Sequence, residues 1–118
     1  MAQPAGTCRF PWTYFLDGVA VHRGVYELKL EADETHADGW IHRVVGVRSL
    51  DLDDEDEDAV IGSVELLCNG DPLAIFIAHQ VKRAAEDVHS FDGRRVFEAA
   101  MENIGNPHVR GGYGRAAA

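Results

Sequence analysis

The sequence predicts an α+β fold in which an antiparallel sheet of four or five strands is followed by two helices packed on one face, a two-layer sandwich. Two observations support this class. Residues 12–68 contain apolar segments with the two-residue alternation of strands, and residues 72–104 contain apolar residues at helical spacing. The strands therefore precede the helices along the chain, which is typical of α+β folds.

The chain is long enough for one domain, which we predict over residues 1–105. Its 118 residues are 46% hydrophobic and 26% charged, as in ordinary globular proteins. Residues 106–118 are predicted to be a flexible tail containing Gly and Arg, because they offer little that could be buried. Their Arg-Gly-Gly stretch at 110–112 resembles segments that stack on single-stranded RNA, but a single copy is more typical of a tail without that function.

The first strands are predicted around a tight hairpin. Residues 1–11 contain two prolines and a glycine, so we expect an irregular lead-in there. Residues 12–16 are aromatic and favour a strand, and the Asp17-Gly18 pair that follows is typical of a two-residue hairpin turn. The returning strand at 19–22 is expected to be broken at Arg23-Gly24.

Three further segments are predicted to be strands, at 25–31, 40–50 and 59–68. In the first, Tyr26, Leu28 and Leu30 share one face, the pattern of a half-buried antiparallel strand. The second is expected to be central, because both of its faces are partly apolar. Its alternation assigns Trp40, His42 and Val44 to one face and Ile41, Arg43, Val45 and Val47 to the other.

Two helices are predicted after a turn at 69–72. Asp71 is a suitable N-cap and Pro72 suits the first helical position, so the first helix should span 72–88. Residues 90–93 are expected to break the chain before a second helix at 94–104, which ends at Gly105. The apolar residues expected on the first helix are Leu73, Phe76, Ile77, Val81, Ala84 or Ala85, and Val88, and those on the second are Val96, Phe97, Ala100, Met101 and Ile104.

Negative charge is concentrated in one segment. The chain has 20 acidic and 11 basic residues, a net charge of −9, and residues 51–58 hold seven acids in eight positions. Without that run the net charge would be −2. A basic nucleic-acid binder is disfavoured, because phosphate binding requires clustered Lys and Arg.

The acidic run is the predicted binding site for a partner protein with a basic surface. Such a run steers basic partners over long range, although a solvated loop without a partner explains the same composition. The pattern does not match a calcium loop, which needs a glycine at position six and a bidentate Glu at position twelve. The candidate partner-binding residues are Asp51, Asp53, Asp54, Glu55, Asp56, Glu57 and Asp58, together with Asp33, Glu34 and Asp38 from a polar turn.

The sequence contains no clear metal-binding or catalytic motif. The six histidines show no metal-ligand spacing, and Gly62-Ser63-Val64 lacks the second glycine of a nucleophile elbow. Cys8 and Cys68 are 60 residues apart and form no Cys-x-x-Cys motif, so both thiols are expected to be free, with Cys68 buried at the end of a strand. We therefore expect no catalytic residue, no metal and no cofactor.

The sequence thus favours a non-enzymatic, inhibitor-like acidic protein that binds a protein with a basic surface and does not bind nucleic acid directly. A nucleic-acid-binding protein is one candidate for this partner. Small size and lopsided charge are similar to those of small acidic inhibitors of nucleic-acid enzymes, such as toxin-immunity and anti-restriction proteins. One alternative is a ligand-binding or catalytic domain with a His/carboxylate site between sheet and helices. Another is a structural subunit whose sheet edge joins a neighbour. No apolar run is typical of a signal peptide or membrane span, so a cytoplasmic location is expected.

Overall fold

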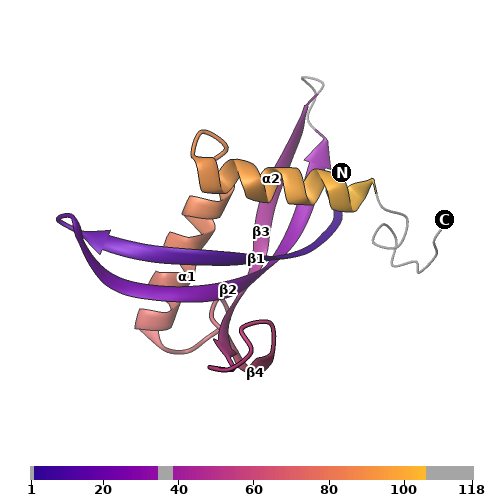
Figure 1. Ribbon diagram of the computed structural model, residues 1–118. Coiled ribbons are helices and arrows are strands. Elements are labelled where there is room, and N and C mark those ends of the chain that lie inside the picture. Colours follow the sequence, from indigo (N-terminus) through magenta and orange to yellow (C-terminus); the bar gives the residue numbers. More distant parts are fainter. Residues whose placement is uncertain (1, 35–38, 106–118) are drawn as a thin grey trace.

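The computed structural model describes residues 2–34 and 39–105 of the chain (Figure 1). In these residues one antiparallel sheet, with strand order β1-β2-β3-β4, is followed by two helices that pack on one of its faces. The α+β two-layer prediction is confirmed, with four strands. Neither helix is long and apolar enough to cross a membrane. The predicted tail at 106–118 lies outside the described residues. The elements are β1 (Ala2–Leu16), β2 (Val19–Glu34), β3 (Trp40–Leu52), β4 (Val60–Glu65), α1 (Pro72–Glu86) and α2 (Phe91–Ile104).

The expectation of an irregular lead-in is wrong, because residues 2–11 belong to β1. They pair with β2 from Ala2, opposite Asp33, to Pro11, opposite Val25, with one irregularity between Pro4 and Thr7. Proline is tolerated there because β1 is an edge strand and does not need every N–H in a ladder. Ala5 and Phe10 of this segment are buried in the core.

The predicted hairpin turn at Asp17-Gly18 is confirmed. Both residues have positive φ, 52° and 80°, as a tight two-residue hairpin turn requires. The predicted break at Arg23-Gly24 is wrong, because these residues pair with Thr13 and Trp12 and β2 runs through them without interruption. At Gly24 a Cβ would lie 2.9 Å from the Tyr26 hydroxyl oxygen, so the glycine makes room for the tyrosine ring.

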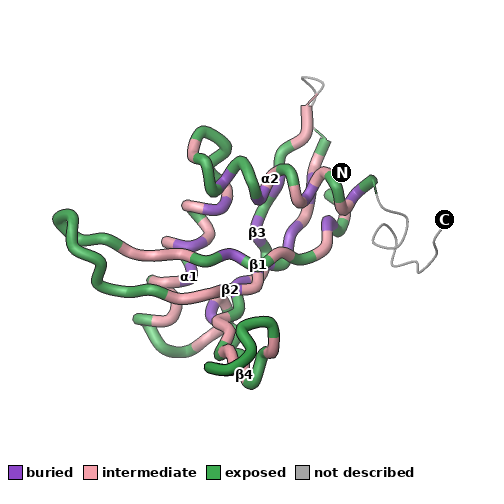
Figure 2. Tube along the Cα trace, in the orientation of Figure 1, coloured by how far each residue is buried: buried purple, intermediate pink, exposed green. Residues whose placement is uncertain are grey.

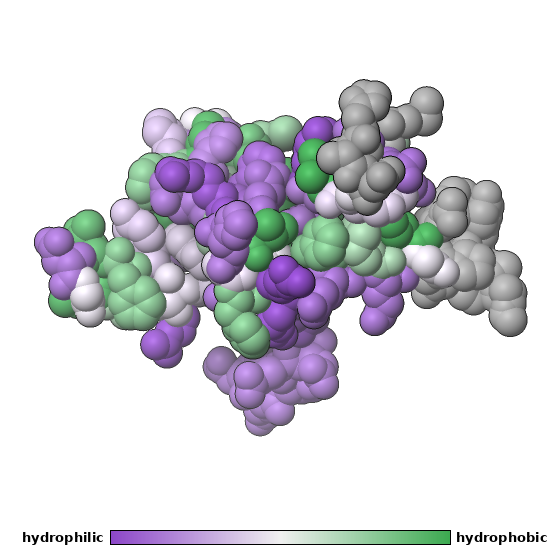
Figure 3. Space-filling model, turned by 90° about the horizontal axis from the view of Figure 1, so that it is seen from above, coloured by the Kyte–Doolittle hydropathy of each residue, from purple (hydrophilic) through white to green (hydrophobic). Residues whose placement is uncertain are grey.

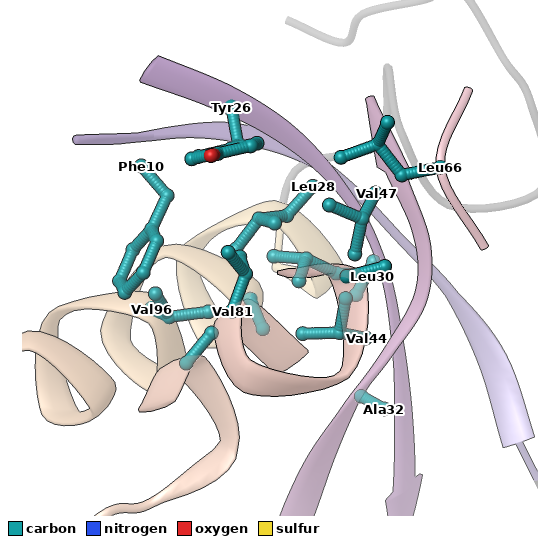
Figure 4. Close-up of a cluster of buried hydrophobic side chains, with 14 of the residues drawn as sticks. Phe10, Tyr26, Leu28, Leu30, Ala32, Val44, Val47, Leu66, Val81 and Val96 are labelled. Atoms are coloured by element: carbon teal, nitrogen blue, oxygen red, sulfur yellow. The ribbon is translucent and has the colours of Figure 1, made fainter. Parts of the chain in front are cut away.

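The core lies between the sheet and the helices (Figures 2 and 4). Tyr26, Leu28 and Leu30 of β2 are buried, as the alternation predicts. The helices cover them with mostly small side chains, which allow close approach to the sheet. The buried helical residues are Ala78, Val81 and Ala85 of α1, and Gly93, Val96, Ala100 and Ile104 of α2.

A bulge in β3 reverses which residues of the second half of this strand point to the core. Leu30 pairs with Val44, but the preceding Lys29 pairs with Gly46, so Val45 has no opposite residue. The extra residue shifts the alternation by one. As a result Val47 is buried with Val44, and the prediction that it shares a face with the exposed Val45 is wrong.

The last strand is shorter and more exposed than predicted. β4 ends at Glu65, Leu66 after it is buried, and the predicted burial of Cys68 is wrong because that residue is exposed. The helices pack mainly on β1, β2 and β3, and β4 therefore receives little cover. Its apolar side chains Val60, Ile61 and Val64 are all exposed.

The start of α1 is as predicted. The Asp71 carboxylate accepts a hydrogen bond from the Leu73 backbone N–H at 3.1 Å, and Pro72 is the first helical residue. The first turns lie beside the β1–β2 hairpin, where Phe76 meets Tyr14 edge-on at 6.0 Å. Leu73 and Phe76 are exposed and do not belong to the core.

Both ends of the connection between the helices differ from the prediction. α1 ends at Glu86, and Val88 beyond it is exposed. α2 begins at Phe91 instead of residue 94, because Ser90 is its N-cap and accepts a hydrogen bond from the Gly93 backbone N–H at 3.0 Å. The residues expected to break the chain therefore form the first turn of α2.

Candidate protein-binding surface

The acidic run lies partly in β3 and partly in the β3–β4 connection. Asp51 and Leu52 are the last residues of β3, and 53–59 form the connection to β4. The loop is closed at its base by the Asp53 N–H, which donates to the Ala59 carbonyl oxygen at 3.0 Å. A second backbone bond joins the Ala59 N–H to the Asp56 carbonyl oxygen at 2.9 Å. We call residues 51–58 the acidic loop.

Two of its own carboxylates hold the acidic loop in shape. Asp53 Oδ1 accepts a hydrogen bond from the Glu55 N–H, and Asp56 Oδ1 accepts one from the Asp58 N–H, both at 3.0 Å. These are Asx turns, in which the side chain replaces a backbone acceptor. Arg9 of β1 donates from Nη1 to the Glu57 carbonyl oxygen at 3.2 Å. The loop is therefore folded back toward β1.

The carboxylates of the acidic loop remain available to a partner. Six of the seven are exposed, and Asp53 is half-buried. The ion pairs in the described part of the chain join Arg43 to Asp33, Arg48 to Glu27 and Lys82 to Glu86, so none of them neutralises the loop. Within the same residues no group of three or more His, Cys, Asp or Glu side chains is arranged to hold a metal ion.

The structure does not bring the two predicted groups of acids together. Asp33 and Glu34 end β2, at the opposite end of the sheet from the acidic loop. Asp33 lies opposite Ile41 of β3. Ile41 and Asp51 are ten residues apart on the same strand, which corresponds to a separation of about 30 Å. Asp33 is also paired with Arg43 at 3.4 Å. Asp38 lies outside the described residues.

His42 is a buried polar side chain between sheet and helices. Its Nε2 lies 2.7 Å from the Ala85 carbonyl oxygen, and because a carbonyl only accepts, Nε2 carries the proton. The ring packs edge-on against Phe97 at 5.7 Å, and Nδ1 has no hydrogen-bond partner among the described residues. His42 therefore ties β3 to the last turn of α1 and has no carboxylate bonded to it.

A groove along the outer edge of β1 was not anticipated from the sequence. Three hollows, of about 290, 440 and 650 Å³, follow β1 from Cys8 to Phe15. The first two share Pro11, and the last two share Trp12 and Thr13. Their other walls come from α1, α2 and the connection between them. No sequence pattern could show this groove, because it arises from the way the helices sit against the strand edge.

Cys8 lines the first of these hollows, and burial raises the pKa of its thiol from 9.0 to about 11, although the Arg95 charge acts in the opposite direction. We expect iodoacetamide at pH 8 to alkylate the exposed Cys68 and to react with Cys8 about 100-fold more slowly than with an unshifted thiol, since each pKa unit reduces the thiolate tenfold. Mass spectrometry of tryptic peptides would measure both rates. Equal rates in denaturant are the control, and equal rates in the native protein would contradict the half-buried position of Cys8.

The raised pKa of Cys8 also predicts how the stability of the protein changes with pH. The folded protein holds the Cys8 proton more tightly than the unfolded chain does. This contribution to stability is therefore complete below about pH 9 and is lost as the pH rises toward 11. A Cys8→Ser variant should lose this alkaline component, which thermal unfolding measured across that range would detect.

The β1–β2 hairpin forms a second exposed feature. Its end extends past the helices in Figure 1, and hydrophobic residues gather at that end of the molecule in Figure 3. The exposed apolar side chains there are Phe15, Leu16, Val19 and Val21. The sequence indicates this surface, because residues 12–22 have apolar side chains at successive as well as alternate positions. Successive residues of a strand point to opposite faces, so apolar side chains lie on both faces of the hairpin.

Comparison with known proteins gives no relative from which a function could be transferred: no family model matches the chain, and neither the curated proteins nor the solved structures contain a significant match.

Proposed function

We propose that this protein is a non-enzymatic binding protein whose acidic loop docks on a basic surface of another protein, in the manner of an inhibitor. The observation that carries the proposal is the state of the loop carboxylates. Six exposed acids lie within eight residues, and the ion pairs of the described chain leave them without a basic partner. A basic surface would supply the missing charges.

The conformation of the loop supports docking over a purely solubilising role. The Asx turns at Asp53 and Asp56 and the bond from Arg9 restrict the loop before any partner arrives. A restricted loop loses less conformational entropy on binding than a flexible one, so more of the electrostatic attraction appears as affinity. A purely solubilising run needs no such restriction.

The nature of the partner follows from the charge. Concentrated negative charge attracts basic proteins and repels nucleic acid, so direct nucleic-acid binding is not part of the proposal. A partner surface that normally holds nucleic acid has the required density of Arg and Lys. We place the protein in the cytoplasm, where the free thiols of Cys8 and Cys68 would stay reduced.

The test replaces Asp53, Asp54, Asp56 and Asp58 together by Asn. Asn keeps the side-chain oxygen that the Asx turns use, so the fold should persist while four charges are lost. The partner is first isolated by capture on the immobilised wild-type protein at low salt. We expect its association rate with the variant to be about tenfold or more lower at low ionic strength, and most of the salt dependence of that rate to disappear. Stopped-flow association at several salt concentrations would measure both effects.

A matched control removes four exposed acids elsewhere, by Asp17→Asn, Asp92→Asn, Glu98→Gln and Glu102→Gln. The net charge of the two variants is then the same. If both slow association equally, the effect belongs to the overall charge and not to the acidic loop. An unchanged rate in the loop variant at low salt would also reject the proposal.

A further inference from the structure

The sheet has unpaired strand edge on β1, β3 and β4, and on β2 before Val25, and the edges of β1 and β3 are obstructed. On β1, Pro4 and Pro11 have no N–H, and the Ala5 carbonyl oxygen already accepts from Asn103 Nδ2 at 2.8 Å. On β3, the part beyond the reach of β4 is covered by α1. The Val44 N–H donates to Glu86 Oε2 at 2.8 Å, and its carbonyl oxygen accepts from Lys82 Nζ at 3.0 Å. These contacts occupy the positions that an added strand would use.

Among the described residues, the outer edge of β4 is obstructed only at its last residue, where Asn69 Nδ2 donates to the Glu65 carbonyl oxygen, and it is open at Ser63. The Leu66 N–H donates to the Val47 carbonyl oxygen at 2.9 Å, so Leu66 and, by alternation, Val64 face β3. Glu65 and Ser63 then face outward, in agreement with the bond from Asn69 Nδ2 to the Glu65 carbonyl oxygen at 3.0 Å. Among the described residues no hydrogen bond satisfies the outward backbone groups of Ser63.

The composition of β4 suits strand pairing. The strand has neither proline nor lysine, and Val60, Ile61 and Val64 are β-branched. Ile61 is 64% exposed, and Val64 is 55% exposed. Natural proteins usually protect an open, apolar edge strand, as β1 and β3 of this sheet are protected, so an unprotected one is a candidate site for strand addition.

The surrounding charge selects the occupant. In an antiparallel pair of two copies, Glu65 of one copy would approach the acidic loop of the other, and in a parallel pair the two acidic loops would meet. Both arrangements bring like charges together. A segment carrying Arg or Lys would instead gain attraction from the acidic loop, which immediately precedes β4, and from Glu65 at its end.

We propose that β4 is a strand-addition site for an extended basic segment of the partner protein. The inference rests on the proposed function and adds the mode of binding. Glu65 lies opposite Arg48 and borders the same hollow as Glu27 and Lys29, on the sheet face that the helices leave uncovered. Basic side chains of the added strand point to this uncovered face, and its apolar side chains point to the other face, beside Val64.

The probe is an eight-residue peptide of alternating Arg and Val with blocked ends. We expect it to protect the Ser63 amide from hydrogen exchange and to shift the amide resonances of β4. In antiparallel pairing, directly opposed residues share a face, so the peptide N–H groups that bond Ser63 belong to Arg. N-methylation of the Arg residues should therefore weaken binding about tenfold or more, and N-methylation of the Val residues should not.

The reverse dependence on methylation would still support strand addition, with parallel pairing. Equal binding of both methylated peptides would overturn the proposal, because it would show attraction without a backbone ladder. The proposed function would survive that result, since it depends on the four-Asn loop variant. The two proposals can therefore fail separately.

Variants of the protein give an independent test. Ser63→Pro removes the outward N–H and leaves the β3–β4 ladder, and Ser63→Ala at the same position keeps the N–H. We expect only the proline variant to lose binding of the Arg/Val peptide, about tenfold or more. Equal affinity of both variants would overturn the proposal. So would a dimer of the free protein in sedimentation that Ser63→Pro converts to a monomer, because a second copy would then be the occupant.

Discussion

Replacing Leu28 by Ala is expected to lower the free energy of unfolding by about 3–4 kcal/mol, because the substitution removes a large side chain from a site that cannot collapse around the gap. Leu28 is 0% exposed and lies in the middle of β2. Its neighbours across the strands are Cys8 on β1 and Val47 on β3, and the helices close the space above it (Figure 4). Urea unfolding followed by circular dichroism would measure the change in the midpoint at constant slope.

Leu16→Ala is the matched control, since it is the same substitution at a residue that is 55% exposed. It should change the free energy of unfolding by no more than about 0.5 kcal/mol. Similar losses for the two variants would mean that the hairpin end is packed, and a loss below about 1 kcal/mol for Leu28→Ala would mean that the core does not lie on this face of β2.

The face of β2 around Leu28 could be predicted because its strand is paired on both sides and regularly pleated there. Alternation then maps directly onto burial. In β3 the same rule worked at His42 and Val44 and failed at Val47, because a bulge inserts Val45. A bulge depends on the register with a second strand, and the composition of one strand does not contain that information.

The edges of the sheet show the second limit of sequence patterns. Residues 2–11 were expected to be irregular because of Pro4 and Pro11, but proline excludes a segment only from a central strand. Which strand is at the edge depends on the complete strand order. The contacts of Lys82 and Glu86 with Val44, and the contrast with open β4, likewise became visible only in three dimensions.

For the candidate site, the sequence predicted the location of the acidic loop and its high exposure. It did not predict the Asx turns at Asp53 and Asp56, or the bond from Arg9, which is 48 residues away from Glu57. The separation of Asp33 from the acidic loop was also missed. Both groups adjoin β-turn regions in the sequence, but successive turns of a meander alternate between the two ends of the sheet.

At the start of α2 the sequence-based prediction is wrong, and a substitution there is expected to reduce stability strongly. Gly93 was assigned to a chain break, yet it is buried in the first turn of the helix. A Cβ at this position would lie 1.9 Å from the Asp87 carbonyl oxygen and 2.9 Å from Ser90 Oγ. The Asp87 oxygen accepts hydrogen bonds from the Ser90 N–H at 3.1 Å and the Ser90 hydroxyl at 2.8 Å, so it cannot move without breaking the turn between the helices.

Gly93→Ala is therefore expected to lower the free energy of unfolding by about 3 kcal/mol or more, the upper range for inserting atoms into a packed site. This loss exceeds the roughly 1 kcal/mol that Ala gains over Gly from helix propensity. Gly105→Ala is the control, because its Cβ would meet atoms only at 3.6 Å or beyond and its φ is −81°. Urea unfolding should show that variant to be neutral or slightly more stable. If Gly93→Ala were also stabilising, the gain in helix propensity would outweigh the contact between the added Cβ and the Asp87 carbonyl oxygen. The turn between α1 and α2 could then not be as tight as it is in the structure.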